Sequence, residues 1–229
     1  MRVPASGWQD DEVTSQLAWT VVVPVKRLGV AKSRLRGALR GVPHEALALA
    51  LAADTVRAVR ACAAVADVLV VTDDPRVAAV AGGAGARVLP DSPAGGLNAA
   101  FRHGASAARG GWVAGLTADL PALRPAELAA ALKAAQAGPA GVRRYVADAP
   151  GSGTVLLAAP PGVALDPRFG VGSAAAHAAS GALALAGDWP SLRRDVDTVE
   201  DLATAARLGL GPRTAALCGA GAAAAGRPV

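Results

Sequence analysis

The chain has 229 residues, of which 52% are hydrophobic and 18% charged, and this is enough material for one core, in a single domain or a domain with a small insertion. Its two cysteines fit no CxxC pattern and its three histidines have no metal-ligand spacing, which argues against a disulfide scaffold and a structural zinc site. The net charge of +5 admits nucleic acid as a partner, but only 3% of the residues are aromatic, so a small phosphorylated ligand explains the charge better.

The ends of the chain predict a cytoplasmic protein with no membrane association. Asp10, Asp11 and Glu12 precede any apolar run, which argues against a secretory signal. No uncharged apolar stretch reaches the roughly 18 to 20 residues that a membrane span needs. We expect residues 1–17 to be a flexible extension, 18–211 to form the single domain, and 212–229 to be an Ala/Gly-rich tail that is disordered or loosely docked.

The first half of the chain predicts a βαβαβ order. Strands are expected at 19–25, 67–74 and 86–91, with helices at 43–63 and 75–85. This order implies parallel strands joined by right-handed crossovers. Because the core must be built from Ala, Val and Leu, we expect helices packed close to a sheet in a layered α/β fold.

The second half continues with further helices and strands. Helices are expected at 95–110, 124–136, 169–180 and 199–209, and strands at 112–120, 142–149 and 154–159. The stretch 192–198 is a further candidate strand. Ligands of an open α/β sheet bind at the carboxyl ends of the strands, so the polar residues directly after each strand are the informative ones.

A basic loop, residues 25–36, follows the first predicted strand. It contains Lys26, Arg27, Lys32, Arg34 and Arg36, together with Ser33. These side chains and the backbone N–H groups before a helix are suited to the phosphates of a very anionic ligand. A basic, solvent-facing turn is the alternative interpretation.

Carboxylates follow the later strands. Asp73 follows the second strand, and Asp119 ends the fourth, where it could hold magnesium or simply cap the next turn. Asp195 and Asp197 would share one face if the strand continued through both. Since Asp197 stands three residues before Glu200, it is interpreted as a helix cap, and Asp195 as the second metal ligand.

Three glycine-containing turns could contact a ligand through their backbone. Gly95 and Gly96 precede a helix and would let a base or ribose approach closely, while Asn98 offers paired hydrogen bonds. The turns "GSGT" (151–154) and "FGVGS" (169–173) could present amides to an anion. The first could equally be a glycine-rich helix entry, and Gly/Ser clusters such as the other two are mostly ordinary turns.

The motifs "VVVPVKRLGVAKSRL", "VTDDP", "GGLNAA", "ADLPAL", "GSGT", "FGVGS" and "DVDTVEDL" occur in this order between residues 19 and 208. Together they resemble the phosphoenolpyruvate/2-phospho-L-lactate guanylyltransferases of coenzyme F420 biosynthesis. The resemblance implies a nucleotidyltransferase-A-like three-layer α/β sandwich with a mostly parallel, mixed sheet of about seven strands. The family pattern often reads Gly-Thr-Gly-Thr where this chain has Ser152.

The resemblance also implies roles for particular residues. Catalysis is expected from Lys26, Asp119 and Asp195, GTP binding from Lys26, Lys32, Ser33, Arg34, Asp73, Gly95, Gly96 and Asn98, Mg²⁺ binding from Asp119 and Asp195, and acid binding from Thr154, Gly170 and Ser173. The implied reaction joins GMP from GTP to phosphoenolpyruvate, releases pyrophosphate, and needs no general base because the phosphate is already ionised. The product would pass to the next transferase of the pathway.

Other functions fit parts of the same sequence. The acid could be 2-phospho-L-lactate or 3-phosphoglycerate, or the domain could bind nucleotides without catalysis. A molybdopterin nucleotidyltransferase or sugar-nucleotide synthase would be expected to carry a glycine-rich loop after the first strand. The stretch from Val25 to Arg34 contains only Gly29, which disfavours these two enzymes.

Overall fold

The computed structural model describes residues 18–29, 33–92 and 95–225, and among them seven strands form one mixed sheet. The strands are β1 (Trp19–Pro24), β2 (Val65–Val71), β3 (Arg87–Leu89), β4 (Trp112–Leu116), β5 (Arg144–Ala147), β6 (Thr154–Ala159) and β7 (Leu183–Ala184). Their order is β3-β2-β1-β4-β6-β5-β7, and only β6 runs antiparallel to its neighbours. The predicted mostly parallel, mixed sheet is confirmed.

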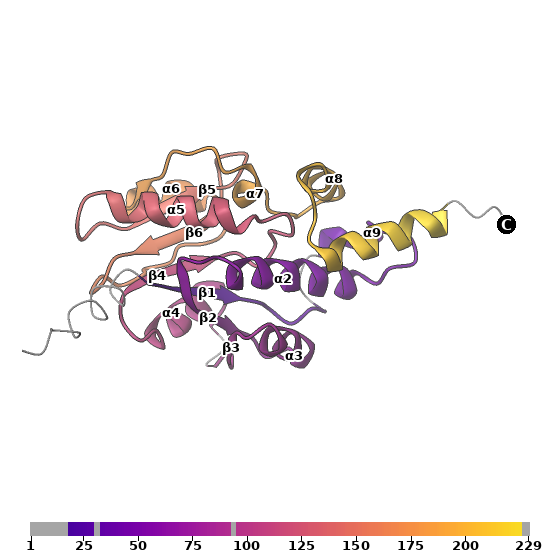
Figure 1. The fold of residues 1–229 in the computed structure, drawn as a ribbon, viewed down its shortest axis with the longest axis horizontal. Helices are drawn as coiled ribbons and strands as arrows, with labels where there is room; N and C mark the ends of the chain where they lie inside the picture. The colour runs from indigo at the N-terminus through magenta and orange to yellow at the C-terminus, as the bar shows by residue number, and fades with distance from the viewer. Residues whose placement is uncertain (1–17, 30–32, 93–94, 226–229) are drawn as a thin grey trace, which may run out of the picture.

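Helices cover both faces of this sheet (Figure 1). They are η1 (Ser33–Leu35), α2 (His44–Arg60), α3 (Pro75–Gly83), α4 (Leu97–Ser106), α5 (Pro125–Ala137), α6 (Ser173–Ala179), α7 (Pro190–Arg193), α8 (Val199–Leu208) and α9 (Pro212–Ala225). In the stretch 192–198, the expected strand is wrong, because its start belongs to α7 and the rest connects α7 to α8. None of the helices in the described ranges has both the length and the apolar character needed to cross a bilayer.

The sheet lies between two layers of helices, and an apolar core fills the space on each of its faces. Val21 and Val23 of β1 pack with α2, α3 and α5 on one face, whereas Val22 packs with α4 and α6 on the other. A strand buried on both faces is apolar at nearly every position, which accounts for the run "WTVVVP", where Thr20 is the one polar side chain. On the second face Gly104 of α4 lies so close to Val22 that a Cβ atom would overlap its side chain. The small helix residues thus allow the close packing that the composition predicted.

The chain order places a crevice between β1 and β4. After β1 the chain adds β2 and β3 on one side, and then returns to β4 on the other side of β1. The carboxyl ends of β1 and β4, which run parallel, are therefore neighbours at the point where the strand order reverses. Such a point is where open α/β sheets bind their ligands.

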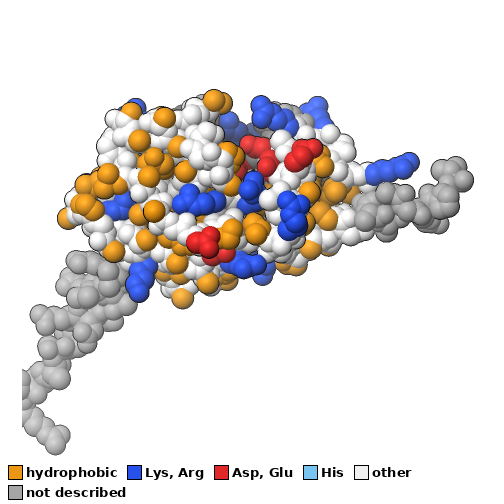
Figure 2. Space-filling view, turned by 90° about the horizontal axis from the view of Figure 1, so that it is seen from above, with side chains coloured by type: hydrophobic (Ala, Val, Ile, Leu, Met, Phe, Trp, Pro, Cys, Tyr) orange, Lys and Arg blue, Asp and Glu red, His pale blue; other side chains and the backbone are white. Residues whose placement is uncertain are grey.

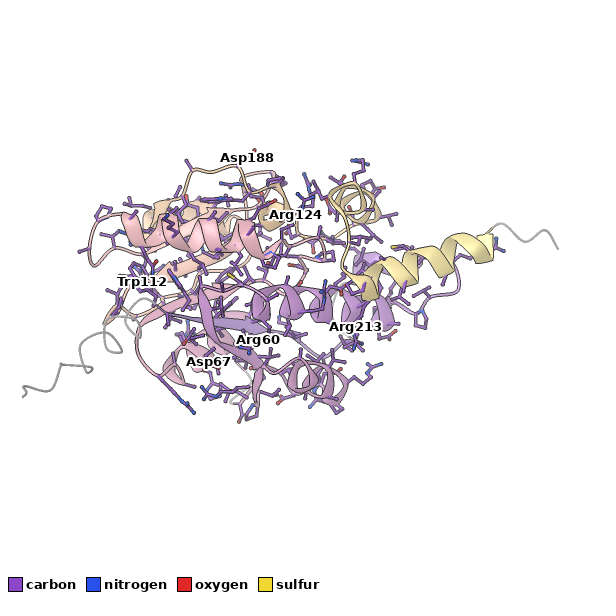
Figure 3. All side chains as sticks on the ribbon, viewed as in Figure 1. Arg60, Asp67, Trp112, Arg124, Asp188 and Arg213 are labelled. Atoms are coloured by element: carbon purple, nitrogen blue, oxygen red, sulfur yellow. The ribbon has the colours of Figure 1, made fainter. Side chains whose placement is uncertain are left out.

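The C-terminal segment corrects one of the two alternatives predicted for it, because residues 212–225 form helix α9 and are not disordered. The buried Asp54 of α2 accepts hydrogen bonds from the backbone N–H groups of Arg213 (3.2 Å) and Thr214 (2.8 Å). This carboxylate satisfies the first turn of α9 from a neighbouring helix. Figure 3 shows Arg213 beside α2, and Figure 1 shows the rest of α9 extending away from the body. The prediction for residues 1–17 lies outside the described ranges.

The surface mixes side chains of all kinds. Figure 2 shows one face on which Lys and Arg stand singly or in small groups among hydrophobic and acidic side chains. Among the described residues, this face has no large basic patch that would attract an anionic ligand. A site for such a ligand is therefore expected at the carboxyl ends of the strands, where the basic loop lies.

Candidate functional site

A cavity of about 460 Å³ opens at the carboxyl ends of β1 and β4, and we call it the strand-end cavity. It is lined by Pro24, Val25, Lys26, Leu28, Arg34, Ala48, Leu51, Ala52, Leu97, Thr117, Ala118, Asp119 and Asp197. One wall, from α2 and the start of the basic loop, is mainly apolar. Its size and its mixture of apolar walls with a few polar groups are typical of a small-molecule site.

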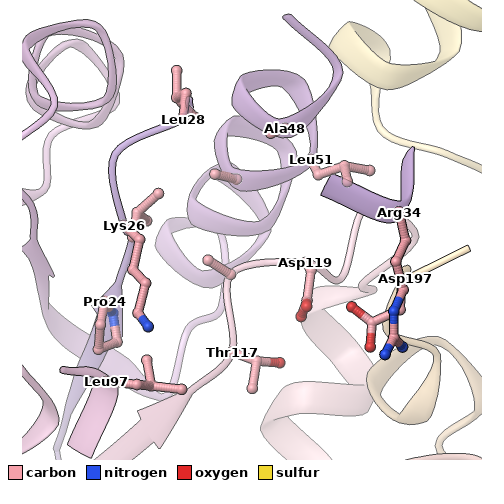
Figure 4. A pocket seen from close by; sticks show the side chains of 13 residues that line it. Pro24, Lys26, Leu28, Arg34, Ala48, Leu51, Leu97, Thr117, Asp119 and Asp197 are labelled. Carbon is pink, nitrogen blue, oxygen red and sulfur yellow. The ribbon is translucent and has the colours of Figure 1, made fainter. Parts of the chain in front are cut away.

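The charged groups of the strand-end cavity come from three separate parts of the chain. Lys26 and Arg34 belong to the basic loop, Asp119 follows β4, and Asp197 precedes α8. In Figure 4 the carboxylates of Asp119 and Asp197 point into the same part of the cavity, and the amine of Lys26 enters from the opposite side. Such an arrangement offers cations to phosphate oxygens and carboxylates to a hard metal ion.

Thr55 fixes the backbone around Asp119. Its fully buried hydroxyl accepts a hydrogen bond from the N–H of Leu120 (3.0 Å) and lies within hydrogen-bond distance of the carbonyl of Ala118 (3.2 Å). The N–H of Thr117 donates to Val155 of β6 (3.0 Å). The segment that carries Asp119 is therefore attached to both α2 and the sheet.

Asp197 is placed by a contact with the same segment. The N–H of Val196 donates to the carbonyl of Asp119 at 3.0 Å, which brings the connection before α8 to the strand-end cavity. The predicted cap role of Asp197 is wrong, because Thr198 is the N-cap of α8 and forms a capping box with Asp201. Asp197 thus lines the cavity, whereas Asp195 is not among the described residues that line it.

The remaining residues predicted to bind nucleotide are spread more widely. Lys32 lies outside the described residues, and Ser33 begins η1. Asp73 accepts a hydrogen bond from the N–H of Asp91 (3.0 Å) and so joins the ends of β2 and β3. Its role in nucleotide binding stays a prediction.

The glycine turn before α4 adjoins the strand-end cavity, since the next residue, Leu97, is part of the lining. Gly96, the N-cap of α4, has a φ of 85° that disfavours any other residue. Asn98 does not present its amide to open space: it donates to the carbonyl of Phe169 (3.0 Å) and accepts from the Phe169 N–H (2.8 Å). The paired hydrogen bonds expected of Asn98 are thus made to the protein backbone.

The two turns predicted to bind the acid lie side by side. The N–H of Ala174 donates to the carbonyl of Ser152 (3.1 Å), which joins "GSGT" to the start of α6. Thr154 and Ser173 are both buried, and Gly170 has a φ of 140°. The structure therefore brings these predicted acid-binding residues together, and their attachment to Asn98 links them to α4 beside the strand-end cavity.

His177 holds the predicted acid-binding residues in place through two hydrogen bonds. Its Nε2 accepts a hydrogen bond from the N–H of Arg168 (2.9 Å), so Nδ1 carries the proton and donates to the hydroxyl of Thr154 (2.9 Å). Burial, together with the smaller effect of the charges of Arg143 and Arg168, lowers the pKa of His177 from its ordinary 6.5 to about 4. The ring is consequently neutral at pH 7.

The donor set of the strand-end cavity fits magnesium bound together with phosphates. No group of three or more His, Cys, Asp and Glu side chains that could hold a metal ion is found within the described ranges. Magnesium usually takes one or two carboxylates and completes its shell with water and substrate phosphates. Asp119 and Asp197 supply the two carboxylates.

Comparisons with known proteins agree with this geometry. The family model of the MobA-like NTP transferase domain matches residues 26–161. A Salinispora arenicola protein named phosphoenolpyruvate guanylyltransferase is 78% identical over 211 residues, which cover 92% of this chain and 98% of that protein. This chain belongs to the phosphoenolpyruvate guanylyltransferase family. A relative of the same name from Geodermatophilus obscurus is 58% identical and covers 88% of this chain and 94% of its own length.

Solved structures share the fold at low sequence identity. A putative nucleotide-diphospho-sugar transferase from Desulfovibrio desulfuricans has a TM-score of 0.63 and 18% identity, and covers 90% of this chain and 95% of its own. A Methanothermobacter nucleotidyl transferase has a TM-score of 0.59 and 19% identity, with 83% and 97% covered. The predicted nucleotidyltransferase fold and family resemblance are confirmed.

Sequence reasoning missed several residues of the site. The sequence around Asp197 indicates only a helix cap, and no local pattern marks Thr55 or His177. Thr55 lies inside a long Ala/Leu helix, and nothing in its neighbours indicates its contact with Leu120. Thr117, which lines the strand-end cavity, could have been found from its place directly after β4.

Proposed function

We propose that the protein is a phosphoenolpyruvate guanylyltransferase, which converts GTP and phosphoenolpyruvate into enolpyruvyl-diphospho-5'-guanosine and pyrophosphate. The observation that carries the proposal is the strand-end cavity, which Lys26 and Arg34 line together with Asp119 and Asp197. The names of the relatives at 78% and 58% identity supply the substrate class.

The chemistry requires positioning more than proton transfer. An ionised phosphate oxygen of phosphoenolpyruvate attacks the α-phosphorus of GTP, a new P–O bond forms, and the bond from the α-phosphorus to the bridging oxygen breaks. Pyrophosphate leaves with the electron pair. Because the nucleophile is already an anion, no side chain has to remove a proton, and the protein acts by orienting two anions and neutralising their charge.

The residues of the strand-end cavity have separate tasks in this proposal. Lys26 and Arg34 bind the triphosphate of GTP and stabilise the charge that builds up on the departing pyrophosphate. Asp119 and Asp197 would hold Mg²⁺, which when bound neutralises phosphate oxygens and brings the two anions together. We assign the second ligand position to Asp197 in place of the predicted Asp195, because Asp197 lines the cavity.

The acid belongs on the other side of the site in this proposal. Thr154, Gly170 and Ser173 would hold its carboxylate and phosphate through hydroxyl and backbone donors. The link from Asn98 to Phe169 supports this, since it joins their turn to the helix that begins at the strand-end cavity. We place the reaction in coenzyme F420 biosynthesis, in the cytoplasm, with the product passing to the next transferase of the pathway.

Pyrophosphate release tests the proposal directly. GTP is mixed in turn with phosphoenolpyruvate, 2-phospho-L-lactate and 3-phosphoglycerate, and the fastest pair is then repeated with ATP, CTP and UTP. We expect the fastest release with GTP and phosphoenolpyruvate. Binding of GTP without release with any of the three acids would instead indicate a noncatalytic nucleotide-binding module, and equal rates with ATP would refute the choice of nucleotide.

A further inference from the structure

Asp74, which follows β2, joins the start of α3 to the basic loop through one carboxylate. Its Oδ1 accepts hydrogen bonds from the N–H groups of Arg76 (3.0 Å) and Val77 (3.4 Å), and so caps α3. Its Oδ2 accepts from the N–H of Leu28 at 3.0 Å. Asp74 is only 6% exposed. The two oxygens of this buried carboxylate therefore have two different tasks.

The task of Oδ2 concerns the strand-end cavity. Leu28 lies in the basic loop, two residues after Lys26, and both residues line the cavity. On the other side of Lys26, the N–H of Val25 donates to the carbonyl of Val71 at 2.9 Å. Lys26 is thus held between two backbone attachments, one to the end of β2 and one to Asp74.

A helix cap alone does not require a carboxylate. Ser, Thr and Asn cap helices about as well as Asp does, and each needs only one oxygen for the task. What Asp adds at position 74 is a second, charged acceptor, and that acceptor is directed at the basic loop. Burial alone would raise the pKa of Asp74, but its backbone hydrogen bonds and the nearby Arg76 lower the pKa below its ordinary value. The carboxylate is therefore charged at neutral pH.

We propose that Asp74 is a positioning residue for nucleotide binding, which acts through Leu28 to hold the amine of Lys26 in the strand-end cavity. The inference rests on the proposed function, because it takes the ligand of Lys26 to be the triphosphate of GTP. An amine on a fixed backbone loses less conformational freedom on binding than one on a free loop, so the attachment should strengthen binding.

Two substitutions separate the two tasks of Asp74. Asp74→Ser keeps a short oxygen for the cap of α3 but removes the acceptor for Leu28. Asp74→Asn also keeps the cap, but its amide nitrogen would face the Leu28 N–H, and two donors cannot bond. We expect both variants to leave α3 folded and to speed amide hydrogen exchange at Leu28 by roughly tenfold or more, the scale of one lost hydrogen bond.

Binding of GTP measures the consequence. Calorimetric titration with GTP and magnesium, in the absence of acid, should show a Kd about 10-fold higher in Asp74→Ser than in the wild type, which corresponds to about 1.4 kcal/mol. The same substitution in a Lys26→Ala background should change the Kd by less than about twofold, because residues that act through one another are not additive. A general loss of structure would weaken binding in both backgrounds.

Asp54→Asn is the matched control, since Asp54 is also a buried carboxylate that accepts from backbone N–H groups of another helix. It should lower the Tm and leave the Kd for GTP within about twofold of the wild-type value. An Asp74→Ser protein that binds GTP like the wild type, or that loses affinity equally with and without Lys26, would overturn the inference. If the wild-type protein itself binds no GTP, the proposed function fails and the role of Lys26 with it, whereas exchange at Leu28 still reports whether Asp74 holds the loop.

Discussion

Acid should destabilise the protein through His177. The ring is fully buried and neutral, with Nε2 accepting from Arg168 and Nδ1 donating to Thr154. Protonation would place a second donor opposite the Arg168 N–H, and it would add a positive charge close to Arg143 and Arg168, which Asp166 only partly offsets. The folded protein therefore resists binding this proton, while the unfolded chain binds it readily.

The sign and size of the effect follow from the pKa of His177, which falls from 6.5 in the unfolded chain to about 4 in the folded protein. A depressed histidine pKa leaves stability intact above pH 6.5 and removes it as the pH falls toward 4, because the unfolded state binds more protons in this window. With these two values, proton linkage gives a loss of about 2 kcal/mol by pH 5 and about 3 kcal/mol by pH 4.

The assay is urea unfolding of the wild type and His177→Gln at pH 7, 6, 5 and 4. Gln has an oxygen near the position of Nε2, so it can still accept from Arg168, and it does not titrate. Subtracting its free energy of unfolding from that of the wild type removes the contribution of the carboxylates, which titrate in both proteins. The difference should fall by about 3 kcal/mol between pH 7 and pH 4. A difference that stays constant over this range would refute the neutral, buried ring.

Three further predictions concern the strand-end cavity and α9. Asp119→Asn and Asp197→Asn should each lower kcat for pyrophosphate release by roughly 100-fold or more, whereas Asp195→Asn should retain most activity. An inactive Asp195→Asn together with an active Asp197→Asn would restore Asp195 as the metal ligand. Lys26→Ala should raise the KM for GTP and leave that for phosphoenolpyruvate nearly unchanged; steady-state kinetics with each substrate varied in turn decides this. Gly211→Ala should destabilise the protein by about 1–3 kcal/mol in urea unfolding, since the new methyl group would overlap the carboxyl group of the buried Asp54 against which α9 starts; unchanged stability would show that α9 can shift.

The sheet and the position of the site could be predicted from the sequence because both depend on local patterns. Continuous apolar runs marked β1, β2 and β4, and the polar residues directly after them fell at one edge of the sheet. Parallel strands must present their carboxyl ends together, so Lys26 and Asp119 were expected to be close without any knowledge of their contacts. The strand-end cavity contains both.

The roles of the last two carboxylates could not be predicted in the same way. Asp197 and Thr198 are both good N-cap residues, and each is followed three positions later by an acidic residue, Glu200 or Asp201. Local sequence does not decide between these two registers. The contact that brings Asp197 to the strand-end cavity is tertiary, from the Val196 N–H to the carbonyl of Asp119, and local sequence does not reveal it.

The C-terminal helix was missed for a related physical reason. A segment rich in Ala and Gly buries little apolar surface, so its composition alone favours disorder. The carboxylate of Asp54 compensates by accepting from two N–H groups of the first turn, which reduces the cost of starting the helix. Nothing within residues 212–229 indicates that partner, because it lies in α2.

The two halves of the candidate site are joined by hydrogen bonds between segments that are distant in sequence. Asn98, in the first turn of α4, makes two hydrogen bonds to the backbone of Phe169, and His177 accepts from the adjacent Arg168. The turn at 169–173 is therefore held both to the helix that begins at the strand-end cavity and to the buried side of α6. Two anions can react only if their separation is fixed against mutual repulsion, and a turn held on both sides provides such fixation. In the proposed function, the amide of Asn98 would therefore attach the turn that binds the acid to the helix beside the nucleotide.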